Sequence, residues 1–318
     1  MKKIISSAFA LLIAVSLLTG CGQNTASAES KSDGQVSVVA TIFPPYDFAR
    51  AVTGDKAEIS MLLLPATESH SFEPTPQDII KIQNCDVFIY NGGESDEWVN
   101  EVLESIDTSE IEIVKFIDCV EVVEEEIVEG MEEEEEGEEH EHGEIDEHVW
   151  TSPRNAKLIV QRISDALCGV DSANAAIYKQ NADAYIAKLE ELDTKFQGVI
   201  DNASRKTIVF GDRFPFRYFA DAYGLDYFAA FPGCSTETEP SAATVAFLID
   251  KVKAEQIPVV FHIELSNARM ADTIAEQTGA KVLELHACHN ISKADFEVGK
   301  TYIDIMTANV DALKEAIG

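Results

Sequence analysis

The sequence predicts an α/β protein with two lobes, each a doubly wound parallel sheet, joined by one long interdomain helix. Strand-like apolar runs alternate with helix-like segments from residue 36 onward, and the same alternation restarts near residue 207. Between the two regions lies a stretch with helical spacing and no proline. Such alternation is typical of parallel sheets covered by helices on both faces. The 46% hydrophobic content over 318 residues excludes global disorder.

The N-terminal lobe is predicted over residues 36–151. Its four strand-like runs read VSVVATI, AEISMLLL, DVFIYNGG and IEIVKFI. The residues between the second and third runs predict the start of a helix. The Thr75 side chain can cap the helix, Pro76 suits its first turn, and the Asp78 side chain can bond the Thr75 backbone N–H in return. These residues predict a helix that begins at Pro76.

Residues 152–204 are predicted to form a helical linker. One helix starts after Ser152, and a second spans roughly 172–203, which contains no proline. About thirty helical residues extend roughly 45 Å, enough to cross from one lobe to the other. The C-terminal lobe follows over 205–318, with the runs TIVFGD, DYFAAF, PVVFHIE and KVLELH and a final helix over 293–317.

Residues 1–20 are predicted to be a lipoprotein signal peptide. Two lysines precede an apolar run that is too short to span a bilayer comfortably and that ends in Leu-Thr-Gly-Cys. Cys21 would carry the lipid, and the small polar residues 21–35 would form a flexible tether. The alternative is an ordinary signal peptide or an anchor helix with a chance cysteine.

The charge is strongly acidic and unevenly distributed. The formal net charge is -33, and residues 121–147 hold 16 of the 57 acidic residues without a single lysine or arginine. An acidic surface repels phosphate backbones, so no nucleic-acid partner is expected. The acidic run is predicted to be a solvated loop, in which His140 and His142 form weak, labile sites that gather metal ions.

Five cysteines remain once Cys21 is lipidated, and an odd number excludes a complete disulfide framework. Cys234 and Cys288 lie in predicted loops. A disulfide between them is one hypothesis, and two free thiols are the other.

Histidines and acidic residues follow the strands of both lobes, where ligands bind in open parallel sheets. His70 follows the second run, and His148 precedes the linker. In the C-terminal lobe the strand ends carry Asp212, Arg213, Glu264, His286 and His289. Imidazoles that come from both lobes predict a divalent-metal site. The sequence has no Gly-x-Ser-x-Gly elbow and no phosphate-cradling loop, which disfavours a nucleophilic enzyme.

With these residues assembled, the chain resembles the zinc and manganese substrate-binding lipoproteins of bacterial ABC importers from Cys21 to Gly318. The motif SHSFEPTPQD has His70 in the first-ligand position, and DEHVWTSPRNA has His148 in the second. The acidic insert before His148 resembles the mobile loop of zinc-type members. FPFRYFADAYGL resembles the third-ligand segment, and FHIELSNARMADTIAEQTGAKVLEL resembles the run that leads to the fourth.

Two positions depart from the family pattern. Arg213 stands where the family usually carries a third histidine or a glutamate, and a guanidinium cannot ligate. His286 stands where the family usually carries an aspartate. The favoured set is therefore His70, His148 and His286, with Glu264 or a water as the fourth ligand, and with Arg213 paired to Glu264 or Asp212. The alternatives are that His289 is the real ligand, or that metal binding has weakened or changed.

The resemblance implies an extracytoplasmic receptor, monomeric and lipid-anchored at the outer face of the cytoplasmic membrane. It would capture Zn²⁺ between its lobes, deliver it to an ABC permease with its ATPase, and catalyse no reaction. Three imidazoles favour zinc over manganese, because manganese prefers carboxylate oxygens. The alternatives are a receptor for manganese or another divalent metal, a zinc hydrolase with Glu264 as its base, and an adhesin or metal-buffering surface protein.

Overall fold

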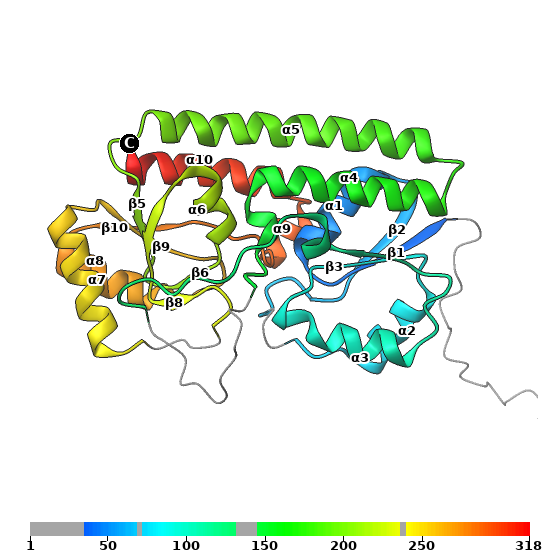
Figure 1. Cartoon of the computed structure of the whole chain (residues 1–318), viewed down its shortest axis with the longest axis horizontal. Helices are drawn as coiled ribbons and strands as arrows, with labels where there is room; N and C mark the ends of the chain where they lie inside the picture. The colour runs from blue at the N-terminus through cyan, green and yellow to red at the C-terminus, as the bar shows by residue number, and fades with distance from the viewer. Residues whose placement is uncertain (1–34, 69–71, 132–144, 236–239) are drawn as a thin grey trace, which may run out of the picture. The chain divides into compact units, whose positions relative to one another are not determined.

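A four-stranded parallel sheet forms the N-terminal half of the molecule (Figure 1). The computed structural model describes residues 35–68, 72–131, 145–235 and 240–318. The strands are β1 (Val36–Ala40), β2 (Ala57–Met61), β3 (Val87–Tyr90) and β4 (Glu112–Lys115), in the order β2-β1-β3-β4. Val38 pairs with Ile59 on one side and with Val87 on the other. Since parallel neighbours need crossover connections, the predicted helix-covered sheet is confirmed for this half.

Three helices connect these strands: α1 (Phe43–Thr53), α2 (Pro76–Asn84) and α3 (Glu97–Ser105). Helix α2 begins where the sequence predicts. Thr75 Oγ1 accepts a hydrogen bond from the Asp78 N–H at 3.3 Å, and Asp78 Oδ2 accepts one from the Thr75 N–H at 3.0 Å. The 3₁₀ turns of this half are η1 (Glu94–Asp96), η2 (Phe116–Cys119) and η3 (Val149–Thr151).

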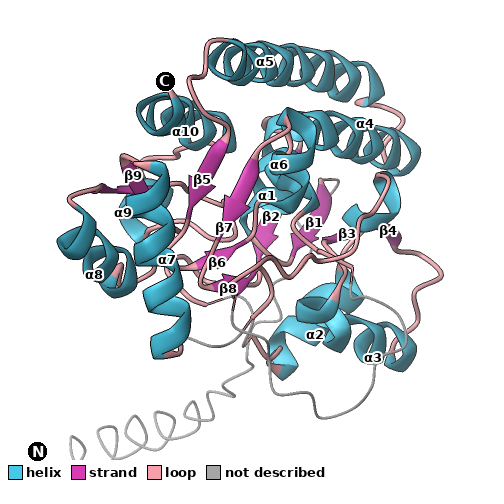
Figure 2. Ribbon diagram, turned by 60° about the vertical axis from the view of Figure 1, so that its left-hand side comes forward, coloured by secondary structure: helices cyan, strands magenta, loops and turns pink. Residues whose placement is uncertain are grey.

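Two helices lead from the first half to the second, α4 (Pro153–Val170) and α5 (Ala175–Asp201). Helix α5 has 27 residues and is about 40 Å long. Asn181 Nδ2 donates to the Val52 carbonyl of α1 at 3.0 Å, while the Phe196 ring packs against Phe219 of the C-terminal half at 4.8 Å. The predicted long helix therefore contacts both halves. Figures 1 and 2 show it lying outside α4 and the last helix, α10 (Tyr302–Ile317).

The C-terminal half contains shorter parallel strands than predicted. Strand β5 (Thr207–Val209) pairs with β7 (Asp226–Phe228), β6 (Arg213–Phe214) with β8 (Phe231–Pro232), and β9 (Val259–His262) with β10 (Lys281–Glu284). A parallel bridge between Phe210 and Phe261 links the first and last of these pairs. Strand β6 ends before Pro215, because proline has no N–H to continue a ladder. The C-terminal half also contains the helices α6 (Arg217–Tyr223), α7 (Ala242–Glu255) and α8 (Arg269–Thr278).

The single final helix predicted over residues 293–317 is wrong. The chain forms α9 (Lys293–Glu297) and then α10, separated by Gly299 at a φ of 73°. A positive φ interrupts helical hydrogen bonding, and glycine adopts it without steric cost. Thr301 and Asp304 then cap α10 reciprocally.

The main apolar core runs through both halves. Phe48 of α1 packs against the ring of Tyr302 at 5.0 Å, and the Tyr302 hydroxyl donates to the Trp150 carbonyl at 2.7 Å. All three side chains are buried. Residues 35–318 accordingly form one compact unit. Within the part of the chain that the structure describes, no helix is both long and apolar enough to cross a membrane.

Candidate metal centre

Two histidines that are distant in the sequence meet in the interior. The ring centroids of His148 and His289 lie 4.6 Å apart at an interplanar angle of 77°. His148 precedes η3, whereas His289 follows β10, and both side chains are buried. Trp150 packs against His289 at 5.0 Å, and its indole N–H donates to the Ala287 carbonyl at 2.7 Å. This hydrogen bond fixes the loop that carries His289 against the segment that carries His148.

His286 is not the histidine in contact with His148. The Asn309 side chain of α10 holds both backbone groups of His286, at 2.9 and 2.8 Å. The His286 Nδ1 accepts a hydrogen bond from the Cys288 N–H at 3.0 Å. Cys288 has a φ of 65°, and this left-handed turn sends His289 toward His148. The alternative that names His289 therefore agrees with the geometry better than the favoured set.

Glu264 shapes the same loop. Its Oε2 accepts the Ala287 N–H at 2.7 Å and its Oε1 accepts the His289 N–H at 2.8 Å. The Nδ1 atoms of His286 and His289 lie 3.5 and 3.7 Å from these oxygens. Burial alone would raise the pKa of Glu264, but the charge of His286 and the hydrogen bond and charge of His289 lower it to about 2. Glu264 is therefore a carboxylate at neutral pH.

Asp146 orients His148. Asp146 Oδ1 lies 3.0 Å from His148 Nδ1 and accepts the His148 backbone N–H at 2.8 Å. Burial, followed by the charges of His289 and Arg213, lowers the pKa of His148 well below its usual value. The imidazole is therefore neutral at neutral pH, as a metal ligand must be. A carboxylate on Nδ1 directs Nε2 to ligation, an arrangement common at metal sites.

Arg213 forms a different ion pair from the predicted one. Its guanidinium pairs with Glu68 at 3.2 Å and donates to the Ser235 carbonyl at 3.2 Å. Asp212 instead accepts backbone N–H groups, from Arg213 at 2.9 Å and from Ile263 at 3.3 Å. The predicted pairing of the Arg213 side chain with Glu264 or Asp212 is therefore wrong, because Glu68 reaches the guanidinium from the N-terminal half.

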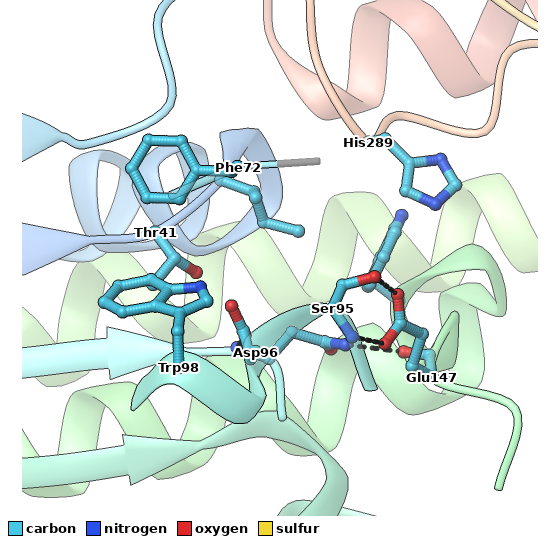
Figure 3. Close-up of a pocket in the computed structure, with 10 residues that line it drawn as sticks. Thr41, Phe72, Ser95, Asp96, Trp98, Glu147 and His289 are labelled. Atoms are coloured by element: carbon cyan, nitrogen blue, oxygen red, sulfur yellow. Dashed lines mark hydrogen bonds between the residues drawn. The ribbon is translucent and has the colours of Figure 1, made fainter. Parts of the chain in front are cut away.

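The end of the acidic run is buried, which the prediction of a solvated loop missed. Asp146 and Glu147 are 1% and 2% exposed. The Glu147 carboxylate accepts the N–H of Ser95 at 3.0 Å and its hydroxyl at 2.5 Å, and Figure 3 shows this pair beside His289 in one pocket. Burial raises the pKa of Asp146 to about 7 and of Glu147 to about 8. The composition gave no sign that these two residues are buried, since both continue the acidic run.

Several predicted site residues, Cys21, His70, His140 and His142, lie outside the described residues. The chain on both sides of His70 reaches the site. Glu68 and His289 line one cavity of about 20 Å³, and Phe72 and His289 line a second of the same size. Asn290 Nδ2 donates to the carbonyls of Leu64 and Thr67 at 2.8 and 2.7 Å and so holds the segment before His70.

The disulfide hypothesis is wrong, because Cys234 and Cys288 are both free thiols. The two face different surroundings. Cys288 is fully buried beside Glu264 and Asp47, whereas Cys234 lies beside Glu147 and Glu125. Burial and these carboxylates raise the pKa of both thiols well above the usual value.

Two α/β halves spanned by one long helix, with imidazoles and carboxylates buried between them, define a metal-binding receptor protein. The chain belongs to the ZnuA family, zinc-uptake complex component A periplasmic, which it matches over residues 38–316. The resemblance inferred from the motifs is thereby confirmed.

The comparisons with individual proteins agree. The chain is 35% identical to the high-affinity zinc uptake system protein ZnuA of Bacillus subtilis, over 98% of this chain and 97% of that protein. It is 33% identical to the zinc-binding lipoprotein AdcA of Streptococcus pneumoniae, over 91% of this chain but only 57% of AdcA. The crystal structure of the Zn(II)-bound ZnuA-like domain of that AdcA matches with a TM-score of 0.75 and 30% identity, over 89% of this chain and 99% of that chain.

Proposed function

We propose that this protein captures Zn²⁺ outside the cytoplasm and delivers it to an ABC permease. The metal would be held by His148, His289 and Glu264, with His70 as a further ligand. The observation that carries the proposal is the contact between two buried imidazoles from opposite halves, beside a carboxylate that is ionised at neutral pH. Nitrogen ligands and one carboxylate suit zinc.

Zinc is favoured over manganese by the same donors. Manganese prefers oxygen ligands, whereas the histidines of the proposed set supply nitrogen. The family and the zinc-named relatives support the same choice. A receptor for manganese or another divalent metal is the second candidate, and competition between the two metals separates them.

We also propose that the protein is a receptor without catalytic activity. A zinc hydrolase needs an open coordination position and room for a substrate. Each of the two cavities that His289 lines measures about 20 Å³, which holds a water molecule but not an organic substrate. Absence of turnover on ester and peptide substrates by the zinc-loaded protein checks this.

The lipid anchor and the monomeric state belong to the same proposal. Residues 1–20 would be removed, Cys21 would carry the lipid, and residues 21–35 would tether the body to the outer face of the membrane. The Streptococcus pneumoniae relative is named a lipoprotein. Cell fractionation tests the anchor: the wild-type protein should remain with membranes, and a Cys21→Ser variant should not. Sedimentation of the protein from Gly22 onward tests the monomer.

Competition titration of the protein from Gly22 onward tests zinc binding, with His148→Ala, His289→Ala and His286→Ala side by side. Loss of a ligand should weaken zinc binding roughly 100-fold or more, because a zinc site draws about 10–16 kcal/mol from a few ligands. We expect this loss for His148→Ala and His289→Ala, and little change for His286→Ala. If His286→Ala weakens zinc binding more than His289→Ala does, His286 is the ligand. If the wild-type protein does not bind zinc tightly, the proposed function is refuted.

A further inference from the structure

A cysteine lies beside His148. One ligand atom each from Glu147, His148 and Cys234 falls within 4.8 Å of the other two. Glu147 and His148 precede η3 in the N-terminal half, whereas Cys234 follows β8 in the C-terminal half. The three combine carboxylate, imidazole and thiol, which are all zinc-ligating groups.

The backbone around Cys234 is shaped to approach the imidazole. A Cβ atom on Gly233 would lie 2.9 Å from His148 Cε1 and 3.1 Å from Nδ1, so only glycine allows this contact. The Cys234 N–H donates to Glu125 Oε1 at 3.0 Å. The position of Cys234 is therefore set by close packing on one side and a hydrogen bond on the other.

Arg213 supports the same loop. It occupies the position where the family resemblance expects a third ligand, and it cannot ligate. Its Nη1 donates to the Ser235 carbonyl at 3.2 Å, next to Cys234, and its Nη2 pairs with Glu68 at 3.2 Å. The C-terminal half thus loses a ligand at Arg213 and uses this guanidinium to hold the loop that carries a thiol.

The surroundings of the thiol call for a cation. Glu147 and Asp146 are buried beside it, and Glu125 bonds its backbone. Asp146 Oδ2 is buried and makes no hydrogen bond to any other described residue. Buried acidic groups this close together can all ionise only where a positive charge compensates them. A divalent metal ion would supply that charge.

We propose that Cys234 is a thiolate ligand of the metal bound at His148, with Glu147 in the same ligand group. The inference rests on the proposed function and names its specificity-determining residue. On binding, a metal–sulfur bond forms and the thiol proton passes to solvent. Sulfur is a soft ligand that zinc accepts and manganese does not favour, so Cys234 would raise the preference for zinc.

Cobalt substitution tests the ligand directly, because a thiolate bound to Co²⁺ gives an intense sulfur-to-metal charge-transfer band in the near ultraviolet. We expect the band in the wild-type protein from Gly22 onward, its loss in Cys234→Ser, and its retention in the matched control Cys119→Ser. Cys234→Ser should also weaken zinc binding roughly 100-fold or more, as expected for the loss of a ligand.

A second variant keeps the test decisive if serine disturbs the loop. Cys234→Asp replaces sulfur by oxygen and should shift the zinc-to-manganese affinity ratio toward manganese by about tenfold or more. Zinc should also slow alkylation of Cys234 but not of Cys119 in the wild-type protein. If the wild-type protein binds zinc tightly but shows no charge-transfer band and no protection, the ligand role of Cys234 is refuted while the transport function stands. If it binds neither zinc nor cobalt, both fail.

Discussion

His289 and His286 differ by only three positions, yet one contacts His148 and the other is held away by Asn309. The difference arises from the left-handed turn at Cys288 and from the hydrogen bond between Trp150 and Ala287. In an irregular loop, sequence spacing does not determine side-chain direction as it does on a helix or strand. At the residue scale, the conformation of the loop therefore decides which of the two histidines faces His148.

Asp96 provides a prediction about pH. It is buried, and its Oδ2 accepts the N–H groups of Asn91 and Gly92 at 2.9 Å each. Burial raises its pKa from 3.8 to about 6 despite these bonds. The folded state therefore keeps a proton that the unfolded chain releases, so the contribution of Asp96 is fully present below pH 3.8 and is lost as the pH rises toward 6.

Replacing Asp96 by Asn removes this titration. Relative to the wild type, the variant should gain about 2–3 kcal/mol in free energy of unfolding between pH 4 and pH 6. Urea denaturation of the metal-free proteins at several pH values measures the difference. The exposed Asp107→Asn is the control and should show no such gain. A constant difference between wild type and Asp96→Asn across this range would contradict the assignment.

At the scale of elements, the connection between β2 and α2 is held by the opposite half. The Asn290 side chain bonds the carbonyls of Leu64 and Thr67, and the Ala66 N–H donates to the Ile291 carbonyl at 2.8 Å. This connection carries Glu68, the partner of Arg213, and leads to His70. Its attachment therefore couples the segment before His70 to the loop that carries His289.

We expect Asn290→Ala to weaken zinc binding about tenfold, because it removes two hydrogen bonds that position the connection, each worth roughly 1 kcal/mol. Competition titration measures the effect. Asn84→Ala, which removes one side-chain bond within α2 on the exposed surface, is the matched control and should leave zinc affinity unchanged. Equal affinities for both variants would show that the connection is positioned by other contacts.

At the scale of the whole molecule, a buried carboxylate joins three helices. Asp47 of α1 accepts hydrogen bonds from the Tyr185 hydroxyl of α5 at 3.0 Å and from the Tyr302 N–H of α10 at 2.9 Å, and it pairs with Arg50. These bonds and the shared apolar core tie the two halves together. We propose that metal release uses loop movement or a modest tilt of the lobes 36–151 and 205–318 on the linker 152–204, since wide opening would break this junction.

Tyr185→Phe tests the junction. The variant should lose about 1 kcal/mol of unfolding free energy, the usual net value of one hydrogen bond, and should still unfold in a single transition. Thermal unfolding followed by far-ultraviolet circular dichroism and by tryptophan fluorescence measures both properties. Two separate transitions in the wild-type protein would mean that the halves unfold independently.

The fold was readable from local patterns. Apolar runs, the Thr75–Asp78 capping box and the proline-free stretch of α5 each specify a local structure through short-range sterics and hydrogen bonding. The final helix was predicted wrongly because its interruption depends on one glycine at a positive φ. The short strands of the C-terminal half were missed because their length is set by pairing partners that the sequence does not identify.

The sequence alone determined the α/β class, the long connecting helix and the metal-binding family, and it identified His148 as a candidate ligand. Only the tertiary structure decided that His289 meets His148, that Arg213 pairs with Glu68, and that Asp146, Glu147 and Cys234 gather around the same imidazole. The physical reason is the distance along the chain over which the interactions act. Helices and strands follow from interactions among neighbours in the chain, whereas a metal site joins loops more than a hundred residues apart, whose approach depends on packing and burial.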